Sequence, residues 1–112
     1  MKPRLSRPAR AAFQELSERS QAIYRDLATT YAIHDAGGIQ VLLSGLKSLD
    51  EAFACEAQID TDGRVIRDRW GQPKAHPLCA VARDARSAWQ AALRSLNLAI
   101  GTPPKTGRPE GL

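Results

Sequence analysis

Apolar residues recur at spacings of three and four through the middle of the chain, and this spacing most restricts the possible fold. The repeat comprises Ile39, Leu42, Leu46, Leu49, Phe53 and the acidic Glu56. Such a repeat lines one side of an α-helix with side chains that pack along a neighbouring helix. We therefore predict a long helix over about 36–60, with Asp35 as its N-cap and turn-forming residues at 60–63.

A second repeat of the same kind follows further along the chain. Its members are Leu78, Ala82, Ala85, Trp89, Ala92 and Leu96. Pro77 suits the first helical turn, where its missing N–H is no loss, so a second long helix is predicted over about 76–98. The two helices should form an antiparallel hairpin. Its packing seam, between helices or between subunits, is predicted to comprise Leu42, Leu46, Leu49, Phe53, Ala82, Ala85, Trp89 and Ala92.

The connection between these two helices has turn signals at both of its ends. Positions 64–73 read Arg-Val-Ile-Arg-Asp-Arg-Trp-Gly-Gln-Pro. β-branched residues between turn signals predict either a small β-hairpin or an extended loop. Trp70 is then either an anchor that holds the loop or an exposed contact residue.

The ends of the chain lack apolar repeats. Residues 1–8 contain two prolines and are expected to be a flexible basic arm, and residues 101–112 a flexible basic tail. Between them we predict a single helical domain over 9–100, with a short turn at 9–15 and a helix over about 18–31. The fold class is therefore all-α: a short N-terminal helix, then the long helical hairpin.

The net charge of +4 is unevenly distributed. The first ten residues carry four cations and no acid, residues 36–62 sum to −4, and residues 63–74 to +3. This pattern indicates a polyanionic partner and charge-complementary contacts between copies. Either the basic residues contact phosphates or they only keep the chain soluble. The candidate phosphate contacts are Lys2, Arg4, Arg7, Arg10, Arg64, Arg67, Arg69 and Lys74.

No motif for an enzyme, a metal site or a membrane span is present. His34 and His76 have no cysteine or second histidine at ligand spacing, and Cys55 and Cys79 make no disulfide framework. There is no phosphate-binding glycine loop and no apolar run near the roughly 18 residues of a membrane span. The basic N-terminus is not followed by the apolar stretch of a secretory signal. We therefore expect an intracellular, non-enzymatic protein without a cofactor.

The second half of the chain resembles the small subunit of phage terminase. Gly71-Gln72-Pro73-Lys74-Ala75-His76-Pro77 matches the G-x-x-K-x-H/N-P motif that precedes a long helix in this family. The family's closing motif, lgL-x-P-x-x-R, corresponds to residues 96–103, with Lys105 and Arg108 beyond. The resemblance covers about residues 15–108 and rests on the order and spacing of weak motifs. The closing segment is spread over more residues than is usual, which leaves the role of the tail open.

This resemblance implies a non-enzymatic protein of viral genome packaging in the host cytoplasm. Family members assemble into homo-oligomeric rings, bind double-stranded viral DNA near its packaging site and present it to the terminase large subunit. That large subunit holds the ATPase and nuclease activities, which the small subunit modulates. Two other classes fit the sequence: a helical adaptor that binds only protein, and a dimeric DNA-binding regulator.

Overall fold

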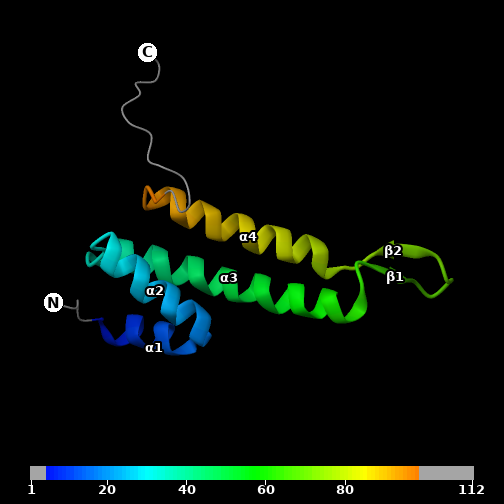
Figure 1. Cartoon of the computed structure of the whole chain (residues 1–112), viewed down its shortest axis with the longest axis horizontal. Helices are drawn as coiled ribbons and strands as arrows, with labels where there is room; N and C mark the ends of the chain where they lie inside the picture. Colours follow the sequence, from blue (N-terminus) through cyan, green and yellow to red (C-terminus); the bar gives the residue numbers. More distant parts are fainter. Residues whose placement is uncertain (1–4, 99–112) are drawn as a thin grey trace, which may run out of the picture.

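The computed structural model of the chain describes residues 5–98, which form four helices and one two-stranded antiparallel sheet (Figure 1). In chain order these are α1 (Arg7–Glu15), α2 (Glu18–Thr30), α3 (Ala36–Asp62), β1 (Val65–Arg67), β2 (Pro73–Ala75) and α4 (Leu78–Ser95). The helical prediction is confirmed. Of the two forms expected for the basic connection, the structure has the β-hairpin.

The centre of the fold is a hairpin of α3 and α4, which lie side by side and run in opposite directions (Figure 1). With 27 residues, α3 is about 40 Å long. Leu42 and Leu46 have no exposed surface, and Leu49 is 3% exposed. The two backbones approach closely at Gly45, where an added Cβ would lie 2.6 Å from the Cβ of Ala92. The two apolar repeats therefore pack against each other within one chain.

Three helix boundaries differ from those predicted by two or more residues. α3 continues to Asp62 and ends where Gly63 takes a φ of +91°. α4 begins at Leu78 and ends at Ser95, so the predicted range of 76–98 is too long at both ends. Its C-terminal end is set by Asn97, which has a φ of +59°. The N–H of Leu98 then donates to the carbonyl of Leu93 at 2.8 Å, and Leu98 turns back into the core.

The N-terminal segment contains a helix, α1, in place of the predicted short turn. The Ser6 hydroxyl caps it by accepting a hydrogen bond from the N–H of Ala9 at 3.3 Å, and Pro8 lies in its first turn. Arg7 and Pro8, predicted to belong to the arm, are therefore helical. Residues 1–4 of the predicted arm and the whole predicted tail, at 101–112, lie outside the described residues.

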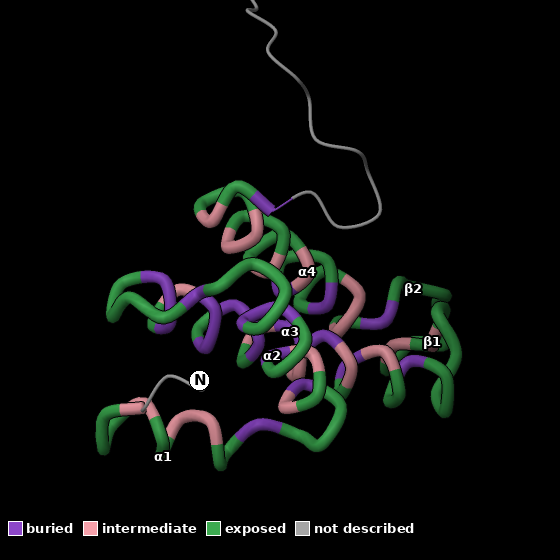
Figure 2. The backbone as a smooth tube through the Cα atoms, turned by 60° about the vertical axis from the view of Figure 1, so that its left-hand side comes forward, coloured by how far each residue is buried: buried purple, intermediate pink, exposed green. Residues whose placement is uncertain are grey.

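The core is concentrated over the first half of α3, where α2 and α4 pack and α1 lies alongside (Figure 1). No residue of α1 is buried, and Figure 2 shows the buried segments gathered in α2, α3 and α4. The second half of α3 packs against α4 in a separate small cluster of Cys55, Ile59 and Ala82. None of the helices within 5–98 has the length and apolar composition of a membrane span.

Candidate nucleic-acid interface

The β-hairpin projects beyond the joined ends of α3 and α4 (Figure 1). Val65 pairs with Ala75, and Arg67 pairs with Pro73, so the loop comprises residues 68–72. Two strands of three residues form no core of their own. The shape of this projection therefore depends on hydrogen bonds at its tip and at its base.

At the tip, Asp68 organises the loop. One of its carboxylate oxygens accepts hydrogen bonds from the N–H groups of Trp70 at 2.8 Å and Gln72 at 2.9 Å. Gly71 has a φ of +77°, and its N–H donates to the Asp68 carbonyl at 3.0 Å. The single acid of the hairpin is thus engaged by backbone donors, and the loop is held in one conformation.

At the base, His76 ties the hairpin to both long helices. The backbone N–H of His76 donates to the Arg64 carbonyl at 2.8 Å, and the ring Nδ1 accepts from the backbone N–H of Leu78 at 3.0 Å. The proton of the neutral ring therefore lies on Nε2, which donates to the Asp62 carboxylate at 2.9 Å. A hydrogen bond from Gln58 and, to a smaller extent, one from His76 lower the pKa of Asp62. The hairpin is consequently fixed in orientation relative to α3 and α4.

The four basic side chains predicted for this connection are exposed on the hairpin and its edges. They are Arg64, Arg67, Arg69 and Lys74. Within residues 5–98 none of them forms an ion pair. Arg67 also supports the loop, since its Nη1 donates to the Gly71 carbonyl at 2.6 Å. The sequence therefore located a set of cations that the fold leaves available to solvent.

Trp70 is 73% exposed at the tip of the hairpin, so of the two predicted roles the structure excludes the buried anchor. The Arg69 guanidinium lies 5.0 Å from the centroid of its ring system. Val65 on β1 is 64% exposed. The tip thus presents an aromatic surface with a cation beside it.

The two N-terminal cations that the structure describes are far from the hairpin. Arg7 and Arg10 are exposed on α1, which lies at the opposite end of the long axis (Figure 1). Lys2 and Arg4 lie outside the described residues. Arg7 and Arg10 therefore do not form one surface with the hairpin cations within a single chain.

The predicted seam residues lie mainly inside the chain. Leu42, Leu46, Leu49, Ala82 and Ala85 are buried, and Phe53, Trp89 and Ala92 are half-buried. The five buried residues therefore belong to the contact between helices of one chain, and they are not available to a second subunit.

Two sets of contacts between helices that involve charged side chains were not predicted from the sequence. Arg86 of α4 makes a bidentate pair with Glu56 of α3, with both N–O distances 2.8 Å, and these hydrogen bonds lower the pKa of Glu56. The Phe53 ring has guanidinium groups at 4.0 Å (Arg19) and 5.3 Å (Arg86) from its centroid. Glu56 interrupts the apolar repeat because it faces Arg86. The one sequence signal for this contact was an acidic residue at a position of the apolar repeat.

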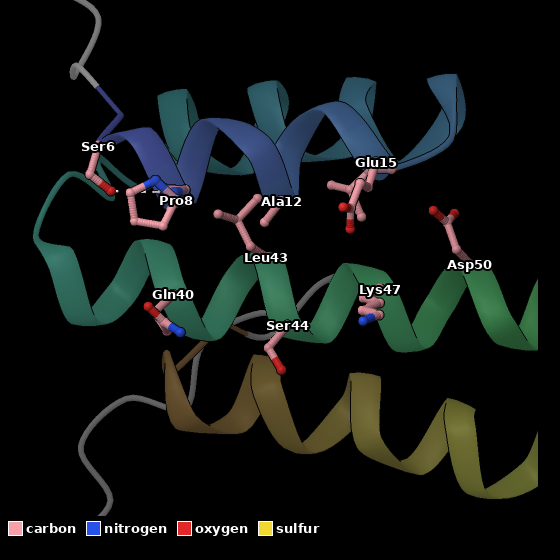
Figure 3. A pocket seen from close by; sticks show the side chains of 11 residues that line it. Ser6, Pro8, Ala12, Glu15, Gln40, Leu43, Ser44, Lys47 and Asp50 are labelled. Atoms are coloured by element: carbon pink, nitrogen blue, oxygen red, sulfur yellow. Dashed lines mark hydrogen bonds between the residues drawn. The ribbon is translucent and has the colours of Figure 1, made fainter.

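A groove of about 360 Å³ lies between α1 and α3 (Figure 3). Its apolar part is formed by Pro8, Ala9, Ala12, Leu16 and Leu43, and Leu43 points towards Ala12. The groove exists because the small side chains of α1 do not fill the space above α3. Its polar rim contains Gln40, Ser44, Lys47, Glu15 and Asp50, which do not form an arrangement for acid–base or nucleophilic chemistry. Throughout the described residues no three side chains are grouped to hold a metal ion.

Comparison of the chain with protein-family models, curated proteins and solved structures gives no significant match. The hairpin surface therefore has to be interpreted from its own chemistry.

Proposed function

We propose that this chain is a non-catalytic DNA-binding protein of the terminase small-subunit type. In this proposal it assembles into a ring, binds double-stranded viral DNA and delivers it to the large subunit, whose ATPase and nuclease it modulates. The observation that supports the proposal best is the rigid hairpin with Arg64, Arg67, Arg69 and Lys74 exposed and free of ion pairs within 5–98.

Phosphate contacts account for most of the affinity of many DNA-binding proteins, and they need exposed cations in a fixed arrangement. A two-stranded β-ribbon is narrow enough to enter the major groove. Fixing the hairpin through Asp68 and His76 removes ordering costs that a mobile loop would have on binding. In a ring, several such hairpins on one DNA molecule would add their weak contacts through avidity.

The test measures the affinity for a short DNA duplex by fluorescence anisotropy over a range of salt concentrations. Arg64→Gln/Lys74→Gln removes two hairpin charges, and Lys47→Gln/Arg94→Gln removes two exposed charges from α3 and α4 as a matched control. We expect the hairpin variant to bind more weakly and to reduce the slope of log K against log salt by about two for each subunit whose hairpin contacts the duplex. Equal losses in both variants, or affinity that salt does not change, would contradict a phosphate-binding hairpin.

The mass of the native assembly separates the proposed ring from the other two classes. A closed ring with many subunits agrees with the terminase type, whereas a two-fold regulator would be a dimer. A monomer that does not bind DNA would instead favour the protein-binding adaptor. Native mass spectrometry at moderate salt makes this measurement on the intact chain.

A further inference from the structure

We infer that Trp70 at the tip of the hairpin is a stacking site for an unstacked nucleobase, as found in single-stranded DNA or at a frayed duplex end. This inference rests on the proposed DNA-binding function and goes further by naming the form of DNA that the tip recognises. Trp70, one of the two tryptophans of the chain, is 73% exposed on a loop that projects into solvent.

The loop holds Trp70 in place without burying its side chain. The backbone N–H of Trp70 donates to the Asp68 carboxylate, and the neighbouring Gly71 closes the turn with a left-handed φ. These bonds involve the backbone of residue 70, so they would form with any residue but proline at this position. The fold of the loop therefore does not need an indole, and the tryptophan requires another explanation.

An exposed indole offers a flat aromatic face on which a base stacks. The Arg69 guanidinium, 5.0 Å from the ring centroid, adds a cation next to that face. Lys74 and Arg64 are exposed on the same hairpin and are therefore available to phosphates of a strand that leaves the stacked base. In an intact duplex each base is already stacked on its neighbours, so the indole gains a partner only where a base is unstacked.

Tryptophan and arginine together also mark the centres of protein interfaces. The charge of the hairpin favours nucleic acid over protein as the partner. Four cations stand against one carboxylate, and that carboxylate already accepts two backbone hydrogen bonds. A protein partner is therefore an outcome of the test rather than a second proposal.

The experiment compares the affinity of the full chain for two labelled probes, an oligothymidine of about 15 nucleotides and a blunt duplex of similar length. Four proteins are measured: wild type, Trp70→Ala, Trp70→Phe and the control Val65→Ala, which removes an exposed apolar side chain without an aromatic face. We expect Trp70→Ala to weaken oligothymidine binding by about tenfold or more, since one base stack contributes that much. Trp70→Phe should retain most of the affinity, and Val65→Ala should match wild type. Duplex affinity should change by less than about threefold in Trp70→Ala, because phosphate contacts remain.

Intrinsic fluorescence gives a second measurement on the same samples. Oligothymidine should quench wild-type emission, and Trp70→Phe, which leaves Trp89 as the single indole, should lose this quenching. Unchanged oligothymidine affinity in Trp70→Ala overturns the inference, as does an equal loss for both probes. Loss of self-association in Trp70→Ala, with DNA binding intact, would also overturn it and assign the indole to a protein contact.

These outcomes distinguish a failure of the stacking site from a failure of the proposed function. If hairpin cation variants weaken duplex binding while Trp70→Ala has no effect, the stacking site is wrong and the DNA-binding hairpin stands. If wild-type protein binds neither probe, both proposals are wrong.

Discussion

At the scale of single residues, Asp50 is the most highly connected polar group of the fold. Its carboxylate accepts hydrogen bonds from the N–H of Ser17 at 2.8 Å and from the hydroxyls of Ser17 and Ser20, both at 2.6 Å. Ser17 is the N-cap of α2, and Ser20 is fully buried. Asp50 therefore fixes the start of α2 against the middle of α3. Burial alone would raise the pKa of Asp50, but these hydrogen bonds and nearby Arg19 outweigh it and lower the pKa.

We expect Asp50→Asn to destabilise the protein by about 2 kcal/mol at neutral pH, because charge-assisted hydrogen bonds to two serines are weakened. The lowered pKa also sets the pH dependence. A carboxylate with a folded-state pKa below its unfolded value stabilises the fold above about pH 4, and this stability is lost as the pH falls. Urea unfolding of wild type and Asp50→Asn between pH 7 and pH 3 measures both effects. Stability of the variant should fall less steeply with acid, and a profile parallel to wild type would contradict the assignment.

Tyr24 has a buried hydroxyl without a hydrogen-bond partner among the described residues. Its ring makes an edge-on contact with Phe13, with centroids 5.3 Å apart, so the aromatic packing does not depend on the oxygen. Burial raises the pKa of this hydroxyl. The ring contributes to the core, while the hydroxyl gives up its hydrogen bonds to water.

Tyr24→Phe should therefore leave stability unchanged or increase it by up to about 1 kcal/mol, since it removes an unsatisfied polar atom. Tyr31→Phe is the matched control, because Tyr31 is 43% exposed. Chemical denaturation measures both variants. A loss of more than about 1 kcal/mol in Tyr24→Phe would show that a bound water or another group satisfies the hydroxyl.

At the scale of elements, the contact between α3 and α4 depends on the absence of a side chain at position 45. An added Cβ on Gly45 would lie 2.6 Å from the Cβ of Ala92 and 3.1 Å from the Trp89 ring. Neither neighbour is the end of a long flexible side chain. The helices would have to separate in order to accept even one methyl group.

Gly45→Ala should destabilise the protein by about 1–3 kcal/mol, even though alanine is the better helix former. Gly37→Ala is its counterpart on the same helix, because the nearest atom to an added Cβ there is an Asp35 oxygen at 3.7 Å. That variant should gain up to about 1 kcal/mol from helix propensity alone. Thermal unfolding followed by circular dichroism compares the pair. A Gly45→Ala protein as stable as wild type would mean that the two helices are not in close contact at this point.

The two long helices could be predicted from the sequence because a spacing of three and four is a local property of each helix. The ends of the helices were harder to predict, because the C-terminal end of α4 depends on the left-handed backbone of Asn97. The short helix α1 was not predicted, since it depends on a cap from Ser6. Polar contacts between distant positions left little pattern in the sequence. Asp50 meets Ser17 across 33 residues, and Arg86 meets Glu56 across 30. At the hairpin the cations were predicted, but the exposure of Trp70 required the structure.

At the scale of the whole molecule, the core is unequally distributed along α3. Its first half contacts α2 and α4 and lies beside α1, and it includes the fully buried Leu42 and Leu46. Its second half is packed against α4 through the small cluster around Cys55, Ile59 and Ala82. Since burial of apolar surface provides most of the stability of a fold, the half that supports the hairpin should open more easily.

Hydrogen exchange measured by mass spectrometry tests this inequality and its relation to assembly. At low protein concentration, backbone amides at 55–62 should exchange at least about tenfold faster than those at 39–49, because local opening of the two-helix half exposes little apolar surface. If copies associate through this half, as the proposed ring allows, protection at 55–62 should rise with protein concentration while protection at 39–49 stays constant. The Gly45→Ala variant is a useful control, since it loosens the first half of α3. It should therefore narrow the difference in exchange rate between residues 55–62 and 39–49. Equal protection of both halves in a dilute monomer would contradict the unequal core, and protection independent of concentration would place any subunit contacts elsewhere on the molecule.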